Sequence, residues 1–225
     1  MNFFATLRGV TPLKPLYKYI KKTTDIFFPE ECILCHKICN QCLCPECLSE
    51  FSTDWQTLNT VTTLSSYHDS PLRQCLHHIK FNQNRRLARW IGTHLAAECH
   101  NLPYQDAIWI PVPQHPNRLK QRGFNPLDDL FGSLIQKNKI KTYPIIQRIR
   151  DTQALHGLSR QDRFKCMDTA FGWHHTFQPH HIIDRDIVIY DDIYTTGSTM
   201  DTVQRLVSTY PIKTCYYVTL AVTDL

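Results

Sequence analysis

The C-terminal third of the chain carries the pattern that most limits its fold. An apolar run at residues 187–190 is followed by a polar stretch at 191–198, an amphipathic segment at 199–210 and a β-rich run at 213–222. This order predicts a strand, a loop, a helix and a second strand. Two strands joined through a helix lie parallel, and a parallel sheet is buried on both faces. We therefore expect an α/β domain whose parallel sheet is flanked by helices.

The rest of the chain adds further α/β elements and a distinct N-terminal part. Apolar periodicity predicts strands at 60–67, 107–112 and 144–149, and helices at 71–79, 84–100, 125–137 and 157–167. Ahead of them come a short amphipathic helix at 11–28 and a cysteine-rich stretch. We predict three parts: an N-terminal amphipathic segment at 1–31, a small metal module at 32–58 and the α/β domain at 59–225.

Composition bears on partners and location only weakly. The 225 residues hold 25 Lys and Arg against 20 Asp and Glu, and the resulting net charge of +5 is compatible with a phosphate-bearing partner. No apolar run approaches the roughly 20 residues that a bilayer-spanning helix needs. The N-terminus also lacks the apolar region of a secretory signal. We expect a cytoplasmic protein with no membrane span.

Six of the ten cysteines lie within sixteen residues. In a reducing cytoplasm such a cluster is more typical of a metal site than of disulfides. The two outer Cys-x2-Cys pairs can point four thiolates at one tetrahedral zinc ion, which would be structural because the chain supplies every ligand; these are Cys32, Cys35, Cys44 and Cys47. A third pair, Cys39 and Cys42, lies between them with His36 nearby. These extra thiols either stay free or supply substitute ligands.

The segment after residues 187–190 has the composition of a phosphate site. Its small residues and hydroxyls precede a helix N-terminus, whose N–H groups and partial positive charge favour an anion; they are Tyr194, Thr195, Thr196, Gly197, Ser198 and Thr199. The adjacent carboxylates of Asp191 and Asp192 would repel phosphate but accept hydrogen bonds from sugar hydroxyls, and a divalent cation could offset their charge. These groups predict a ribose 5-phosphate site. An Asp-rich turn with a Thr/Ser helix cap would give the same pattern.

Other signatures of phosphate binding and hydrolysis are absent from the sequence. It contains no GxxxxGK[ST] nucleotide loop and no GxGxxG, and neither GxSxG nor HExxH. A Walker-type NTPase, a serine hydrolase and a zincin therefore have no support. His174-His175 and His180-His181 lack companion ligands at regular spacing, and we predict no metal role for them.

Several stretches together resemble known families. The run Asp191–Thr199 (DDIYTTGST), after an apolar strand, is similar to the diphosphoribosyl-binding signature of phosphoribosyltransferases. With the cysteine pairs, Phe27-Phe28-Pro29, Ile110–Pro113 (IPVP) and Arg118–Asn125 (RLKQRGFN), the chain more narrowly resembles the ComF family of competence proteins. The resemblance covers about residues 26–225. It implies a type I phosphoribosyltransferase-like sheet with an N-terminal zinc-ribbon or knuckle module.

The resemblance also implies roles for individual residues. Asp191 and Asp192 would be the catalytic pair at the ribose, the loop from Tyr194 to Thr199 would hold the 5-phosphate, and Mg2+ would accompany phosphoribosyl diphosphate. The implied pyrophosphate-binding residues are Arg118, Lys120, Arg122 and Lys80. Leu155 and Cys166 stand where the family often has Gln and Asn, which bears on the acceptor and not on phosphate binding.

Two functions follow from these features. The ComF resemblance implies a cytoplasmic role in DNA uptake during natural transformation, with phosphoribosyl diphosphate, single-stranded DNA and other uptake proteins as partners. The alternative is an active phosphoribosyltransferase that transfers phosphoribosyl to a base or an amine. One mixed run of cations and aromatic residues suits single-strand binding, but it is also typical of a solvated helix face: Lys80, Phe81, Arg85, Arg86, Arg89 and Trp90.

Overall fold

The computed structural model describes residues 30–58, 60–67, 70–150 and 170–223. It divides into two compact units, Met1–Cys44 and Pro45–Leu225. The described residues of the first unit form a short knuckle, in which the Cys32 N–H donates to the Lys37 carbonyl at 2.8 Å and the His36 N–H to the Cys32 carbonyl at 2.9 Å. The helices predicted at 11–28 and 157–167 lie outside the described residues.

The second unit is built on a six-stranded sheet of order β1-β2-β8-β7-β3-β4, in which only β1 is antiparallel. Its strands are β1 Gln56–Leu58, β2 Val61–Ser66, β3 Ile108–Pro111, β4 Lys141–Thr142, β7 Ile187–Tyr194 and β8 Cys215–Val222. The helices are α2 Pro45–Leu48, α3 Pro71–Phe81, α4 Arg85–Glu98, α5 Pro116–Arg122, α6 Pro126–Lys137 and α8 Ser198–Val207, with a 3-10 helix η2 Pro179–His181. A separate antiparallel pair joins β5 Ile146–Arg148 and β6 Phe171–Trp173.

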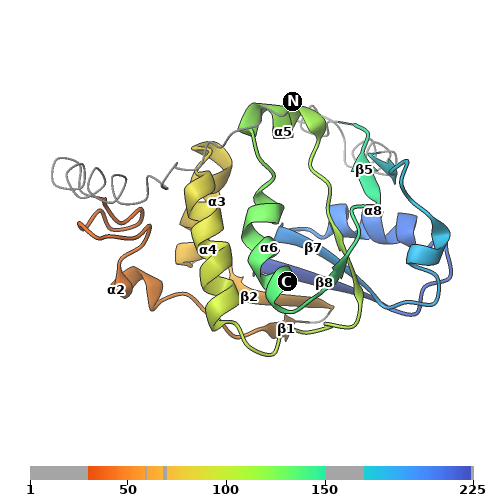
Figure 1. Ribbon diagram of the computed structural model, residues 1–225, viewed down its shortest axis with the longest axis horizontal. Helices are drawn as coiled ribbons and strands as arrows, with labels where there is room; N and C mark the ends of the chain where they lie inside the picture. Colours follow the sequence, from red (N-terminus) through yellow and green to blue (C-terminus); the bar gives the residue numbers. More distant parts are fainter. Residues whose placement is uncertain (1–29, 59, 68–69, 151–169, 224–225) are drawn as a thin grey trace, which may run out of the picture. The chain divides into compact units, whose positions relative to one another are not determined.

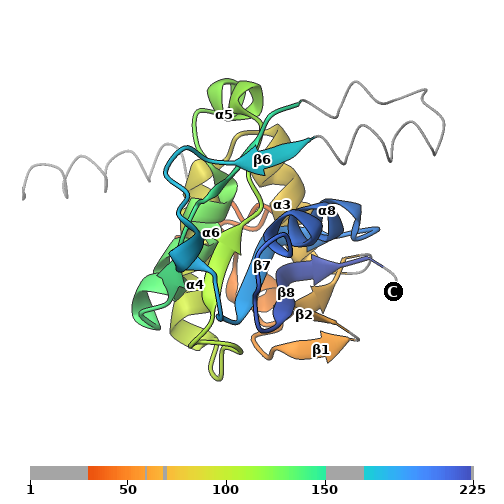
Figure 2. The same cartoon turned by 90° about the vertical axis from the view of Figure 1, so that its right-hand side faces the viewer.

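Helices cover both faces of this sheet, as predicted. Helices α4 and α6 pack side by side on one face (Figure 1), where Phe131 of α6 contacts the ring of Tyr190 in β7. Helix α8 covers the other face (Figure 2), over a core that includes Ile189 and Val203. The β5–β6 pair packs on the α8 side, because Phe171 belongs to the same core. The expected α/β fold with a largely parallel sheet is therefore confirmed. In the described part of the chain, no helix is long and apolar enough to span a bilayer.

The clearest difference from the predicted elements is the length of β7. The sequence pattern ends this strand at residue 190, but it continues to Tyr194. Asp191 still pairs with Thr219 of β8 and Tyr194 with Val222, so the backbone pairing of the two strands continues past both aspartates. The predicted loop at 191–198 was wrong because adjacent aspartates look like turn residues, whereas the pairing partner extends the strand. The loop spans only residues 195–197, and α8 begins at Ser198.

Two helices lie at the carboxyl edge of the sheet, where ligands of α/β folds bind. Helix α3 starts just after β2, capped by Ser70, and its last turn brings Lys80 to Asp192 near the end of β7. Helix α5 follows β3, starts at the His115 cap and stops at Gly123, whose φ of 75° is left-handed. The ends of β2, β3 and β7 thus place α3, α5 and the α8 loop around one edge.

Candidate functional site

The cysteine cluster gathers the thiols of the two outer Cys-x2-Cys pairs. All four Sγ atoms lie within 4.8 Å of one another, in Cys32, Cys35, Cys44 and Cys47. A tetrahedral zinc ion with Zn–S bonds of about 2.3 Å needs sulfurs roughly 3.8 Å apart, and those of Cys35 and Cys44 are 3.5 Å apart. Cys39 takes no part in this cluster, since its thiol donates to the Gln41 carbonyl at 3.0 Å. The four thiols fit a closed, structural zinc site.

The surroundings of Cys32 favour the thiolate form that binds metal. Burial raises the pKa of its thiol, but backbone N–H groups of Cys35, Cys44 and Leu34 donate to the sulfur and lower the pKa to about 6. A thiol with such a pKa is ionised at neutral pH, and the thiolate is the species that ligates zinc. The cluster therefore could hold a metal such as zinc, with the ligands that the spacing predicts.

Replacing Cys35 with serine is expected to remove zinc from the protein. Cys35 is exposed, so the substitution takes away one of four ligands without opening a cavity. Elemental analysis after dialysis should then fall from about one ion per chain to near zero. Cys39→Ser is the matched control and should keep its zinc. Metal loss in Cys39→Ser with retention in Cys35→Ser would identify Cys39 as a ligand instead.

The carboxylates of Asp191 and Asp192 lie on opposite faces of β7, because side chains alternate along a strand. Ile189 points into the core under α8, and Asp191 continues that row. Tyr190 packs against α6, and Asp192 continues the second row. Asp192 is buried, and each of its two oxygens is 2.9 Å from Nζ of Lys80. Helix α3 and strand β7 are thus joined at the carboxyl edge by an ion pair.

The ion pair between Lys80 and Asp192 is largely shielded from solvent, with side chains 25% and 5% exposed. Burial lowers the pKa of Lys80, but attraction by Asp192 and Asp191 outweighs burial and raises the pKa overall. Lys80 therefore stays an ammonium ion. Removing either partner would leave a buried, uncompensated charge, which is costly.

Asp191 is the group whose ionisation is most perturbed at this edge. Burial, followed by repulsion from Asp192, raises the pKa of Asp191 to about 8. The charges of Lys80 and Arg148 and a hydrogen bond from the Asp192 N–H, at 2.8 Å, oppose this shift without cancelling it. Asp191 is therefore mostly protonated at neutral pH. Carboxyl groups with strongly shifted pKa values concentrate at functional sites.

The predicted 5-phosphate segment forms a tight connection from β7 to α8. Its residues lie at the end of β7 (Tyr194), in the loop (Thr195, Thr196 and Gly197) and in the first turn of α8 (Ser198 and Thr199). Gly197 has a φ of 75°, and a Cβ there would also collide with the Tyr194 hydroxyl, so both conformation and packing require glycine. The first N–H groups of α8 have no partners within the helix. Together with the exposed loop, they suit an anion.

A cavity of about 270 Å³ lies between the end of α3 and α5. Its lining is polar and cationic, formed by Lys80, Phe81, Gln83, Arg118, Gln121 and Arg122. Burial lowers the pKa of Arg122, attraction by Asp192 opposes this shift, and repulsion by Arg118 adds to it, so these charges lie close together. Of the predicted pyrophosphate residues, Lys80, Arg118 and Arg122 meet at this cavity. Lys120 is exposed and is not among the lining residues.

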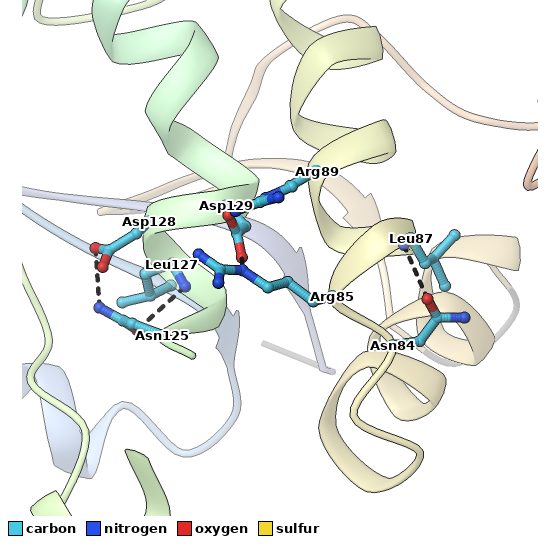
Figure 3. A network of polar contacts seen from close by, with 8 residues as sticks. All are labelled: Asn84, Arg85, Leu87, Arg89, Asn125, Leu127, Asp128 and Asp129. Carbon is cyan, nitrogen blue, oxygen red and sulfur yellow. Dashed lines mark hydrogen bonds and ion pairs between the residues drawn. The ribbon is translucent and has the colours of Figure 1, made fainter. Parts of the chain in front are cut away.

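The cations of α4 are engaged by a carboxylate of α6. Asp129 accepts from Nε of Arg85 at 2.7 Å and from Nε of Arg89 at 3.0 Å, as Figure 3 shows. These bonds hold α4 against α6 and neutralise part of the charge on that face. The mixed cationic and aromatic run therefore divides: Lys80 and Phe81 line the cavity, whereas Arg85 and Arg89 join two helices.

The two carboxylates do not fit a Mg2+ ion as they stand. Mg2+ needs ionised oxygen ligands in near-octahedral geometry. Both oxygens of Asp192 contact Lys80, and Asp191 is mostly protonated at neutral pH. Across the described ranges, the cysteine cluster is the one place where three or more metal-ligating side chains converge. The expected Mg2+ therefore stays a prediction.

Two parts of the site were not predicted from the sequence. Helix α5 is not among the helices predicted from the sequence, although Pro116 in its first turn and Gly123 after Arg122 are usual signals of a helix start and end. Arg148 acts on Asp191 through its charge, and no sequence signal marks it. That contact depends on how the β5–β6 pair packs against the sheet.

Comparison with known proteins finds no family model that matches the chain, but it finds several curated relatives. The chain is 31% identical over 170 residues to DNA utilization protein YhgH of Salmonella typhi, covering 72% of this chain and 70% of that protein. It is 29% identical over 170 residues to Competence protein F of Haemophilus influenzae, covering 72% and 71%. YhgH of Escherichia coli K12 is 28% identical over 169 residues, covering 72% and 70%. The chain therefore belongs to the ComF family, with Competence protein F and YhgH as its relatives.

Proposed function

We propose that this protein acts in the uptake or use of DNA and that it binds phosphoribosyl diphosphate at the carboxyl edge of its sheet. The names of its relatives, a competence protein and DNA utilization proteins, support the first part. The ComF resemblance adds the cytoplasm as the compartment. One observation carries the choice of ligand: Lys80, Arg118 and Arg122 converge on a cavity beside buried Asp192.

The chemistry of this ligand matches the groups along the edge. Its diphosphate needs several positive charges within reach, and guanidinium forks match phosphate oxygens in pairs. Its 5-phosphate suits the N–H groups at the start of α8. Its ribose hydroxyls are donors, and carboxyl oxygens such as those of Asp191 and Asp192 in β7 can accept from them.

Transfer of the phosphoribosyl group to a base or an amine is the second candidate. Pyrophosphate would leave from C1 of the ribose as the acceptor bonds there, and the protein would contribute positioning and charge. A screen for pyrophosphate release across bases and amines separates this activity from binding alone. Turnover with one acceptor class would establish the enzyme, and no turnover despite binding would establish a binding protein.

Single-stranded DNA is a further proposed partner, supported by Phe81. Its side chain is 69% exposed, lines the cationic cavity and contacts the ring of His77 at 4.4 Å between centroids. An exposed aromatic ring beside cations is what single-strand binders use to stack bases. Oligonucleotide binding that is insensitive both to salt and to Phe81→Ala would contradict this assignment.

The cavity assignment is tested by replacing Arg122 with glutamine. We expect phosphoribosyl diphosphate to bind about 10–100-fold more weakly, because a hydrogen bond to a charged group contributes about 1.5–3 kcal/mol. Arg185→Gln is the matched control: Arg185 is exposed just before β7, at the opposite edge of the sheet, and should leave the affinity unchanged. Isothermal titration calorimetry measures the affinity of both variants for phosphoribosyl diphosphate. Equal affinities for the two variants would exclude the cavity as the diphosphate site.

A further inference from the structure

We infer that Lys80 takes the place of a divalent cation at this site, so that the diphosphate binds through Lys80, Arg118 and Arg122 without Mg2+. This inference rests on the proposed function and specifies which charges neutralise the ligand. It also assigns Lys80 a role beyond contact with pyrophosphate, as the group that joins the ligand to Asp192.

The Lys80 ammonium contacts Asp192 and also lines the cavity, so it can bridge the carboxylate and a ligand bound there. Nζ contacts both oxygens of Asp192 at 2.9 Å, and the same residue lines the cavity. An ammonium has three N–H donors. Two of them serve the two carboxylate oxygens, which leaves the third for a phosphate oxygen in the cavity. A metal ion between Asp192 and a diphosphate would make the same two connections.

The side chains near the cavity neutralise most of the charge of the diphosphate without a metal. A diphosphate group carries roughly −3 at neutral pH, and Lys80, Arg118 and Arg122 line the cavity with three positive charges. Asp192 contributes one negative charge and Asp191 is mostly protonated, so about one negative charge of the diphosphate is left without a side-chain partner. A Mg2+ ion bound to Asp192 would have to displace Lys80 and would then lie beside its ammonium and the Arg122 guanidinium. Like charges at such short range repel strongly in a partly buried site.

A second explanation gives Lys80 a purely structural role, as the partner that neutralises a buried carboxylate. Both explanations predict lower stability when Lys80 is removed. They differ in how ligand binding responds to metal. If Lys80 is only structural, it does not affect whether diphosphate binding requires Mg2+. If Lys80 replaces the metal, then Lys80 and Mg2+ can substitute for each other in diphosphate binding.

The first experiment titrates the unmodified protein with phosphoribosyl diphosphate and with inorganic pyrophosphate, once in EDTA and once in excess Mg2+. We expect affinities that agree within about threefold, because the side chains supply the charge. Binding only in Mg2+ would overturn the inference and leave the proposed function standing. Binding under neither condition would overturn the proposed function and the inference with it.

The second experiment replaces Lys80 with methionine. In EDTA the affinity for pyrophosphate should fall about 10–100-fold, the usual cost of losing a charged hydrogen-bond donor. Excess Mg2+ should restore most of this loss, because the carboxylate of Asp192 is then available to the ion. Lys80→Arg keeps the charge and should still bind in EDTA. Lys213→Met, an exposed lysine ahead of β8, is the matched control and should behave as the unmodified protein.

A double variant distinguishes a loss of binding from a loss of folding. Lys80→Met combined with Asp192→Asn removes both charges, so thermal unfolding should recover relative to Lys80→Met alone. This double variant should bind pyrophosphate weakly in EDTA and equally weakly in Mg2+, since no carboxylate is left to hold the ion. Undiminished binding by Lys80→Met in EDTA, or recovery in Mg2+ by the double variant, would overturn the inference.

Discussion

A Gly92→Ala variant is expected to lose about 3 kcal/mol of unfolding free energy, although alanine favours a helix over glycine by roughly 1 kcal/mol. Gly92 lies on the face of α4 that packs against α6, and it is buried there. A Cβ at this position would lie 2.8 Å from the Leu130 carbonyl oxygen and would collide with that of Asp129. Both obstacles are backbone atoms, so the two helices must separate to admit one methyl group.

Separation of α4 and α6 would spread through the core between them. Ile91 and Leu95 of α4 and Leu130 and Leu134 of α6 are buried, and the two helices pack closely. Close-packed interiors accommodate extra volume poorly. The same displacement would stretch the bonds from Arg85 to Asp129. For a chain of this size, a loss of about 3 kcal/mol lowers Tm by roughly 6–12 °C.

The matched control is the same substitution on the facing helix. A Cβ at Gly132 of α6 has no heavy atom within 4 Å, so Gly132→Ala gains the helix propensity of alanine without a clash. It should stabilise the protein by roughly 0.5–1 kcal/mol. Urea unfolding measures both variants under one condition. Effects of the same sign at the two glycines would contradict the close approach of α4 and α6.

The fold class was predictable because it depends on patterns that the sequence displays directly. The apolar run of β7, the amphipathic α8 and the β-rich β8 follow one another, and such an order leaves few alternatives to a parallel unit. The convergence of four cysteines was predictable for a similar reason, since two Cys-x2-Cys pairs can bring their thiols together, and those of Cys32, Cys35, Cys44 and Cys47 do lie within 4.8 Å of one another. The end of β7 was not predictable, because the continuation of this strand through Asp191 depends on pairing with Thr219 of β8.

The sequence named candidate residues for the site, but it did not reveal how their side chains contact one another. The resemblance pointed to Lys80 and Asp192 separately, yet their ion pair joins residues 112 positions apart and depends on α3 crossing the edge of the sheet. The engagement of Arg85 and Arg89 by Asp129 likewise needs two helices side by side. Periodicity reports which face of an element is apolar. It does not report which polar groups meet across elements.

Replacing Asp191 with asparagine is expected to stabilise the protein, by a margin that grows as the pH rises from about 4 to about 8. The pKa of Asp191 in the folded protein is raised to about 8 from an ordinary value of 3.8. Between these values the unfolded chain is ionised at this position while the folded protein holds a proton. The stability that the protonated carboxyl provides is complete below about pH 4 and is lost as the pH approaches 8.

Asparagine keeps the shape of the neutral carboxyl group and does not titrate, so it avoids this loss. A shift of this size corresponds to about 5–6 kcal/mol if it is fully expressed. Because Asp191 is partly exposed, solvent screening reduces the expected gain to about 1–3 kcal/mol near pH 8. Denaturant unfolding of both proteins at pH 4, 6 and 8 measures this gain in stability. The exposed Asp106→Asn is the control and should show no such trend.

An Asp191→Asn variant that is less stable than the unmodified protein at pH 8 would mean that the carboxylate is ionised and held by its neighbours. An ionised Asp191 could then serve as an oxygen ligand for Mg2+, which would weaken the case for Lys80 as a substitute for the ion.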